Sequence, residues 1–138
     1  MNTHPNLTKN QSLVYDVLSK AKLPLTAYSV LDDLRESGFR APPQVYRALE
    51  KLQKLGLIHR LESLNAFVAC RHSDCQSHGL IAFTICEKCG EVTEIAEKSI
   101  EMEILSLTEK QSFVAKKTSI EISGTCVSCT APNHKEQL

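Results

Sequence analysis

The sequence lacks a long apolar run, an apolar leader and a net charge. Polar residues interrupt the uncharged stretch from Cys75 to Cys86, so no segment is predicted to span a membrane. Residues 1–10 include charged and polar side chains but no apolar core, so we expect no secretory signal. Sixteen Lys or Arg balance sixteen Asp or Glu, so the overall charge identifies no partner. We therefore expect a cytoplasmic protein whose cysteines are reduced or metal-bound.

The small charge that does exist is unevenly distributed. A chain of 138 residues that is 42% apolar can form one or two small folded domains. Residues 1–69 contain nine Lys or Arg and six Asp or Glu, a net charge of +3, and the remainder has a net charge of −3. A basic first half suits an anionic partner, although a difference this small identifies none by itself.

The first forty residues have the pattern of two short amphipathic helices. Thr8 and Gln11 form a capping-box pattern ahead of an apolar stripe. Thr26 is a second N-cap, and Gly38 stands where the second helix is expected to end. Proline is tolerated in a first helical turn, so Pro42-Pro43 is predicted to open a third helix.

The third helix is followed by two short apolar segments, residues 57–62 and 66–70, which are predicted to form a hairpin. Three helices followed by a two-stranded ribbon predict a winged helix over residues 1–70, a variant of the helix-turn-helix that binds DNA. The amino end of the third helix would enter the major groove. Arg47 could contact guanine or phosphate, Gln44 could pair with adenine, and Tyr46 could reach a thymine methyl or a phosphate oxygen. The predicted DNA contacts, with two phosphate-binding cations included, are Arg40, Gln44, Tyr46, Arg47 and Lys51.

Residues 71–79 show no periodicity and are predicted to link the winged helix to a second domain at residues 80–130. Two strands, a helix and a third strand are expected there, and residues 131–138 are expected to form a disordered tail. The predicted elements are strands at residues 80–85, 91–96 and 113–122 and a helix at residues 98–111. The fold class is therefore α+β, and an exposed sheet edge in the second domain suits a dimerisation unit.

Two CxxC pairs stand at the two ends of this second domain. They are separated by 36 residues and consist of Cys86 with Cys89 and Cys126 with Cys129. Four thiolates that converge on one point form a closed structural zinc site. Disulfides, a redox-active pair and iron–sulfur ligation are alternatives. Two matched pairs without a secretory signal favour zinc, which would staple the domain across its ends.

These features together resemble the ferric uptake regulator family of bacterial metal-sensing repressors, and most closely its zinc uptake regulator branch. Three stretches carry the resemblance: residues 44–49 (QVYRAL), residues 55–63 (LGLIHRLES) and residues 83–90 (FTICEKCG) with the later CxxC. The start of the third helix, Ala41-Pro42-Pro43, departs from the commoner polar cap of the family. The family implies a dimer of winged-helix subunits that binds operator DNA when loaded with metal.

The resemblance also implies a second, regulatory zinc site, and therefore two zinc ions per subunit. Its ligands would be His59, Cys70, His78 and Glu94. Imidazole, thiolate and carboxylate suit a four-coordinate zinc, and the thiolate favours zinc over harder ions. Compared with some members of the family, the spacing after His78 is one residue longer, so His72 or Cys75 could replace His78 or join the site.

The expected function is a zinc-dependent repressor of zinc-uptake genes. A sensor of iron or peroxide with the same fold, and an interaction module in which zinc is only a staple, are the alternatives. A zinc hydrolase with Glu94 as general base is disfavoured, because a catalytic zinc keeps an open position and each predicted site has four protein ligands. We therefore expect no enzyme, no organic substrate and no membrane partner.

Overall fold

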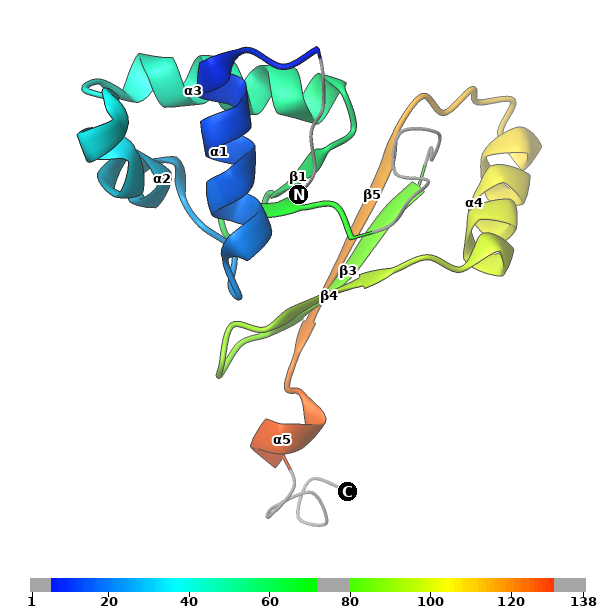
Figure 1. Cartoon of the computed structure of the whole chain (residues 1–138). Coiled ribbons are helices and arrows are strands. Elements are labelled where there is room, and N and C mark those ends of the chain that lie inside the picture. Colours follow the sequence, from blue (N-terminus) through cyan, green and yellow to red (C-terminus); the bar gives the residue numbers. More distant parts are fainter. Residues whose placement is uncertain (1–5, 72–79, 131–138) are drawn as a thin grey trace. The chain divides into compact units, whose positions relative to one another are not determined.

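The computed structural model describes residues 6–71 and 80–130 of the chain. The chain divides into two compact units, residues 1–76 and residues 77–138, which are coloured along the sequence in Figure 1. Within the described residues, no helix is both long and apolar enough to cross a membrane. The expected α+β class, with a winged helix first and a small α/β unit second, is confirmed.

The first unit begins with two capped helices. Helix α1 spans Lys9–Lys20, and Thr8 and Gln11 form the predicted capping box, since each side chain bonds the backbone N–H of the other. Helix α2 spans Ala27–Leu34, and the Thr26 hydroxyl accepts from the N–H of Ser29 at 3.1 Å. Both predicted N-caps are therefore confirmed, and they satisfy amide donors that a helix start leaves unpaired.

A short 3-10 helix, η1, spans Arg35–Ser37 and ends at Gly38, whose φ of 104° is strained for any residue with a Cβ. Helix α3 then spans Pro42–Lys54, with both prolines in its first turn. Its cap differs from the usual one, because Ala41 has no side-chain acceptor. Instead, the Gln44 amide oxygen accepts the N–H groups of Arg40 at 2.7 Å and Ala41 at 3.1 Å.

The wing is an antiparallel ribbon of β1, Ile58–Leu61, and β2, Ala66–Ala69. An isolated bridge between Leu25 and Phe67 adds the segment between α1 and α2 to its edge, with N···O distances of 3.0 and 2.8 Å. This bridge ties the wing to the helices. The core beneath is built from apolar faces of all three helices and the ribbon, and its fully buried members include Val14, Leu18, Val30, Val45, Leu49, Leu52 and Ile58.

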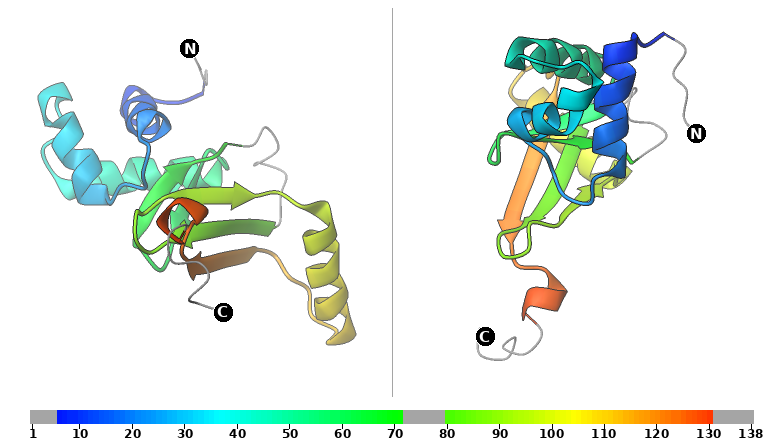
Figure 2. Two further views of the ribbon diagram at one scale, coloured as in Figure 1. Left: turned by 90° about the horizontal axis from the view of Figure 1, so that it is seen from below. Right: turned by 60° about the vertical axis from the view of Figure 1, so that its left-hand side comes forward.

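The second unit is a three-stranded sheet in the order β4-β3-β5. The strands are β3, Leu80–Cys86, β4, Val92–Ile95, and β5, Thr118–Gly124. Strand β3 pairs antiparallel with β4 and parallel with β5. The end of β3, the start of β4 and the end of β5 therefore meet at one end of the sheet. The short helix α5, Val127–Thr130, follows β5 at that end (Figure 2).

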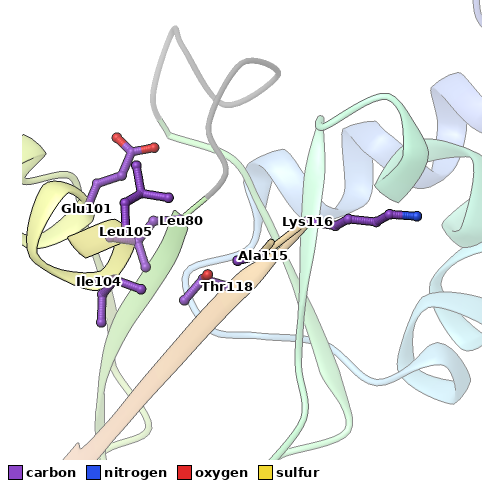
Figure 3. Close-up of a pocket in the computed structure, with 7 residues that line it drawn as sticks. All are labelled: Leu80, Glu101, Ile104, Leu105, Ala115, Lys116 and Thr118. Carbon is purple, nitrogen blue, oxygen red and sulfur yellow. The ribbon is translucent and has the colours of Figure 1, made fainter. Parts of the chain in front are cut away.

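Helix α4, Lys98–Lys110, connects β4 to β5 at the opposite end of the sheet (Figure 2). Glu101, Ile104 and Leu105 of α4 face Leu80 and Thr118 across a shallow cavity, whereas the Lys116 side chain points away from it (Figure 3). No residue of α4 is buried. The helix therefore leaves most of its apolar surface uncovered within its own unit.

The predicted start of the third strand at residue 113 is wrong, because β5 begins at Thr118. Ser112 adopts a left-handed φ of 55°, and the Phe113 N–H bonds back to the Thr108 carbonyl at 2.9 Å. Residues 113–117 therefore follow the closing turn of α4 as a loop and not as part of the strand. The predicted domain limits at residues 70 and 80 enclose residues 72–79, which the structure does not describe, so those limits stay a prediction.

Candidate metal centres and nucleic-acid interface

The four cysteines of the two CxxC pairs come together at one end of the second sheet. Cys86 is the last residue of β3, and the chain then turns tightly: the Gly90 N–H bonds the Cys86 carbonyl at 2.9 Å, and Gly90 has a φ of 82°. Cys126 precedes α5, and Cys129 lies within it. Because β3 and β5 run parallel, their ends deliver both pairs to the same place.

The spacing of the four sulfurs matches a tetrahedral metal site. All four Sγ atoms lie within 4.8 Å of one another. The distance from Cys86 to Cys129 is 3.8 Å and from Cys89 to Cys126 is 3.7 Å, and none of the four is disulfide-bonded. A zinc ion about 2.3 Å from each of four sulfurs would separate any two of them by about 3.8 Å. The donor set and its geometry therefore fit a closed zinc site with no open position.

The electrostatics of the cluster also call for a cation. The backbone N–H groups of Cys89, at 3.4 Å, and Cys126, at 3.3 Å, donate to the Cys86 sulfur. They lower the pKa of Cys86 to about 6, which favours its thiolate. The neighbouring Cys126 sulfur, together with burial, raises the pKa of Cys129 to about 12. Four sulfurs at this spacing cannot all be thiolates unless a metal ion offsets their mutual repulsion.

Two of the predicted regulatory ligands meet on the wing. His59 is opposite Val68 in the ribbon, and Cys70 follows two residues after Val68, on the same face. The Cys70 N–H extends the ribbon by bonding the Leu57 carbonyl at 2.9 Å. The ligand atoms of His59 and Cys70 lie within 4.8 Å of each other, and His59 is only 5% exposed. A histidine and a cysteine are thus paired in a sheltered position.

The other predicted ligands do not belong to the described residues of the first unit. Glu94 belongs to the second unit, where it lies partly buried on β4 opposite Phe83. His78 and its alternatives His72 and Cys75 lie outside the described residues. Cys70 is disulfide-bonded in this structure and must be reduced before its thiolate can bind a metal.

The predicted DNA contacts lie on or just before α3, with most of them on its exposed surface. Arg40, Tyr46, Arg47 and Lys51 are exposed, whereas Val45, Ala48 and Leu49 face the core. Gln44 is partly buried and its amide oxygen caps the helix, so in this structure that oxygen is engaged at the backbone. The base contact expected of Gln44 stays a prediction, and only its amide nitrogen could make it without opening the cap.

Two side chains with a structural role here were missed by sequence reasoning. Gln44 stands three residues after Ala41, which is half of a capping-box pattern, and that half was readable from the sequence. Arg71 bonds carbonyls at the end of α1, fifty residues away, and no local pattern signals such a contact.

The fold and these sites define a two-unit winged-helix protein with a four-cysteine metal centre. The model of the ferric uptake regulator family matches residues 4–123, and the chain belongs to that family. The recognition made from the motifs is therefore confirmed. The zinc uptake regulation proteins of Escherichia coli K12 and Shigella flexneri are each 36% identical over 135 residues, which cover 95% of this chain and 78% of theirs.

The chain is also similar to solved structures of zinc uptake regulators and, in fold, to that of a ferric uptake regulator. A zinc uptake regulator complexed with zinc and DNA is 35% identical with a TM-score of 0.85, and covers 94% of this chain and 86% of that one. Holo XcZur is 35% identical with a TM-score of 0.82, covering 91% of this chain and 86% of that one. A ferric uptake regulator from Francisella tularensis with iron is 22% identical with a TM-score of 0.61, a likeness of fold alone.

Proposed function

We propose that this protein is a zinc-responsive repressor, which binds operator DNA as a zinc-loaded dimer and shuts off zinc-uptake genes. The observation that carries the proposal is the His59–Cys70 pair, a histidine and a cysteine whose ligand atoms lie within 4.8 Å of each other on the wing of a winged helix. Two kinds of relative support it: proteins named for zinc uptake regulation, and a solved zinc uptake regulator that is complexed with zinc and DNA. We assign the protein to the cytoplasm, where operator DNA would be bound and thiols stay reduced.

We assign two zinc ions to each subunit, one to each ligand set. The structural ion is held by Cys86, Cys89, Cys126 and Cys129. In the regulatory site His59 and Cys70 supply two of the four ligands that zinc requires, so at least two more must come from elsewhere. We assign Glu94 and His78 to those positions, with His72 or Cys75 as alternatives to His78. Bound zinc supplies a cross-link among these side chains, and its preference for thiolate separates this site from one for iron.

The regulatory ligands belong to different parts of the chain, and this gives the response its mechanism. His59 and Cys70 belong to the winged helix, and Glu94 belongs to the second unit. When all of them hold one ion, the winged helices of a dimer can move less relative to the second units. The two winged helices are then already ordered when they bind two DNA half-sites about 34–36 Å apart. Zinc and DNA therefore strengthen each other's binding, typically by about 1–3 kcal/mol.

The second unit provides the surface for the dimer. Its helix α4 and the loop after it expose Met102 at 63%, Leu107 at 53% and Phe113 at 61%. Strand β5 pairs only with β3 among the described strands, so it forms an edge of that sheet. A second copy of the chain would cover both. A dimer is needed because one winged helix buries little surface on DNA.

The recognition helix would contact DNA through its exposed side chains. Arg47 and Tyr46 are assigned to base edges or phosphates in the major groove, and Arg40 and Lys51 to phosphates. Gln44 is assigned to a base contact through its amide nitrogen. Because the first unit carries a net charge of only +3 through residue 69, specificity depends on these contacts more than on a general positive field.

Zinc-dependent binding of a DNA fragment from the protein's own promoter region tests the proposal. Under reducing conditions, Cys70→Ser should raise the zinc concentration needed for binding by about 10-fold or more while the dimer stays folded. Matched titrations with iron and manganese test the alternative sensors. Elemental analysis should find two zinc ions per wild-type subunit and one per Cys70→Ser subunit. If the variant binds the fragment at unchanged zinc levels, the regulatory site is assigned wrongly.

A further inference from the structure

Arg71 forms a fork-shaped contact with the end of α1. Its Nη1 donates to the Ser19 carbonyl at 3.1 Å, and its Nη2 donates to the Ala21 carbonyl at 3.3 Å. These carbonyls belong to the last turn and the C-cap of α1, where a helix leaves acceptors unpaired and where its dipole attracts a cation. The planar guanidinium suits such a pair of acceptors better than an ammonium group does.

This contact fixes the chain on the far side of Cys70. On the near side, Ala69 is buried in β2 at 2% exposure, and the Cys70 N–H bonds the Leu57 carbonyl at 2.9 Å. On the other side stands Arg71. Once its disulfide is reduced, Cys70 is held between these two anchors, and without the second one its backbone would be free to leave the ribbon.

The anchor for Arg71 is itself rigid. Helix α1 buries Val14 and Leu18 completely, and they belong to the same core cluster as Leu49 and Leu52 of α3. Arg71 and α1 therefore fix the position of Cys70 relative to the core of the first unit, which includes the recognition helix α3. A ligand thiol held in this way keeps its distance to His59. A metal ion bound to it would then restrain the whole winged helix and not Cys70 alone.

We propose that Arg71 is a positioning residue for zinc sensing: its bond to the end of α1 holds the Cys70 thiol in place for the regulatory zinc. The inference rests on the proposed function, in which Cys70 is a zinc ligand. Arg71 is not one of the residues assigned above to zinc or to DNA.

Arg71→Gln in the full-length protein, with the structural zinc retained and under reducing conditions, tests the role. The zinc concentration for half-maximal operator binding should rise about tenfold, in the range seen when a partner of a metal ligand is lost. Operator affinity at saturating zinc should stay close to wild type. Arg71→Lys, which keeps the charge but not the fork, should fall between the two. Lys22→Gln is the matched control, because it removes the same charge near the end of α1 and leaves both hydrogen bonds intact.

A second readout requires no regulatory zinc. With that site emptied by a mild chelator, the rate at which iodoacetamide alkylates Cys70 is followed by peptide mass spectrometry. Arg71→Gln should speed alkylation of Cys70, while Lys22→Gln should not. A purely structural cap predicts a lower melting temperature with an unchanged zinc midpoint and unchanged alkylation, and that result would overturn the inference.

The two readouts separate the inference from the proposed function. If wild-type operator binding ignores zinc, or Cys70→Ser responds to zinc normally, the proposed sensing function fails whatever Arg71 does. If wild type responds and Cys70→Ser does not, while Arg71→Gln matches Lys22→Gln in both readouts, the role of Arg71 alone fails.

Discussion

The two units of the chain are stabilised in different ways. In the first unit, helices and ribbon surround a dense core, and side chains such as Val14, Val30 and Leu52 are fully buried. In the second unit, the buried residues among those described all lie on the single strand β3. Helix α4 buries none of its residues and has no side-chain bond at its N-cap Glu97.

The contrast implies that only the first unit contains enough apolar burial to fold by itself. Each fully buried Leu or Ile contributes about 1.5–3 kcal/mol relative to exposure, and the first unit contains many such residues. The second unit is small, and domains of its size need a metal, disulfides or a partner subunit. The four-cysteine cluster lies at one end of its sheet. At the other end lie the exposed side chains of α4, which we propose a second copy of the chain covers. We therefore expect the second unit, but not the first, to require its metal for folding.

The largest expected effect comes from breaking the four-cysteine cluster. Cys89→Ser should unfold the second unit, because structural zinc contributes about 10–16 kcal/mol to such domains. The first unit should keep its helices. Circular dichroism, zinc content and size-exclusion chromatography of the full chain measure the three consequences: partial loss of signal, loss of the structural zinc and loss of the dimer.

The matched control for that variant is Cys70→Ser, which removes a thiol from the wing and should leave both the second unit and the dimer intact. A Cys89→Ser protein that still holds a full complement of zinc and remains a dimer would refute the idea that the second unit depends on its metal.

The next largest effect separates a true core leucine from an exposed one. Leu49 is 1% exposed in the core of the first unit, and Leu107 is 53% exposed on α4. Leu49→Ala should lower the free energy of unfolding of the first unit by about 2–5 kcal/mol. Leu107→Ala should leave that transition unchanged and instead weaken the dimer. Urea unfolding followed by circular dichroism, at two protein concentrations, distinguishes the two outcomes. A concentration-dependent transition in wild type that Leu107→Ala leaves unaltered would place the dimer contact elsewhere.

Local features of the sequence predicted local structure well, and long-range contacts were predicted less well. The caps at Thr8 and Thr26 and the start of α3 at Pro42 follow from side-chain chemistry within one turn, so they could be predicted. The convergence of the two CxxC pairs was expected from their chemistry, but the parallel pairing of β3 with β5 that produces it spans more than thirty residues. The late start of β5 depends on the left-handed turn at Ser112, where serine gives no strong signal of its own.

In the candidate site, too, local features were easier to predict than long-range contacts. The position of His59 relative to Cys70 follows from the register of the ribbon. The hairpin pattern in the sequence limits the possible registers but does not select one. The capping role of Gln44 was missed because an alanine occupies the cap position, so the usual two-sided pattern is absent. The bond from Arg71 to the end of α1 depends on how the wing folds back on the first helix, and a sequence pattern carries no information on that.

The smallest effect tests whether capping in the first unit adds to its core. Thr26→Ala removes the acceptor for the Ser29 N–H and should lower the free energy of unfolding by about 1 kcal/mol. Thr26→Ser keeps the hydroxyl and is the control, so it should fall close to wild type. Because Thr26 and Leu49 share no hydrogen bond, Thr26→Ala combined with Leu49→Ala should give the sum of the single losses, provided that the first unit unfolds in one step. A double variant well below that sum would mean that the first unit is not the self-sufficient, cooperative body that its core implies, and the contrast with the metal-dependent second unit would weaken accordingly.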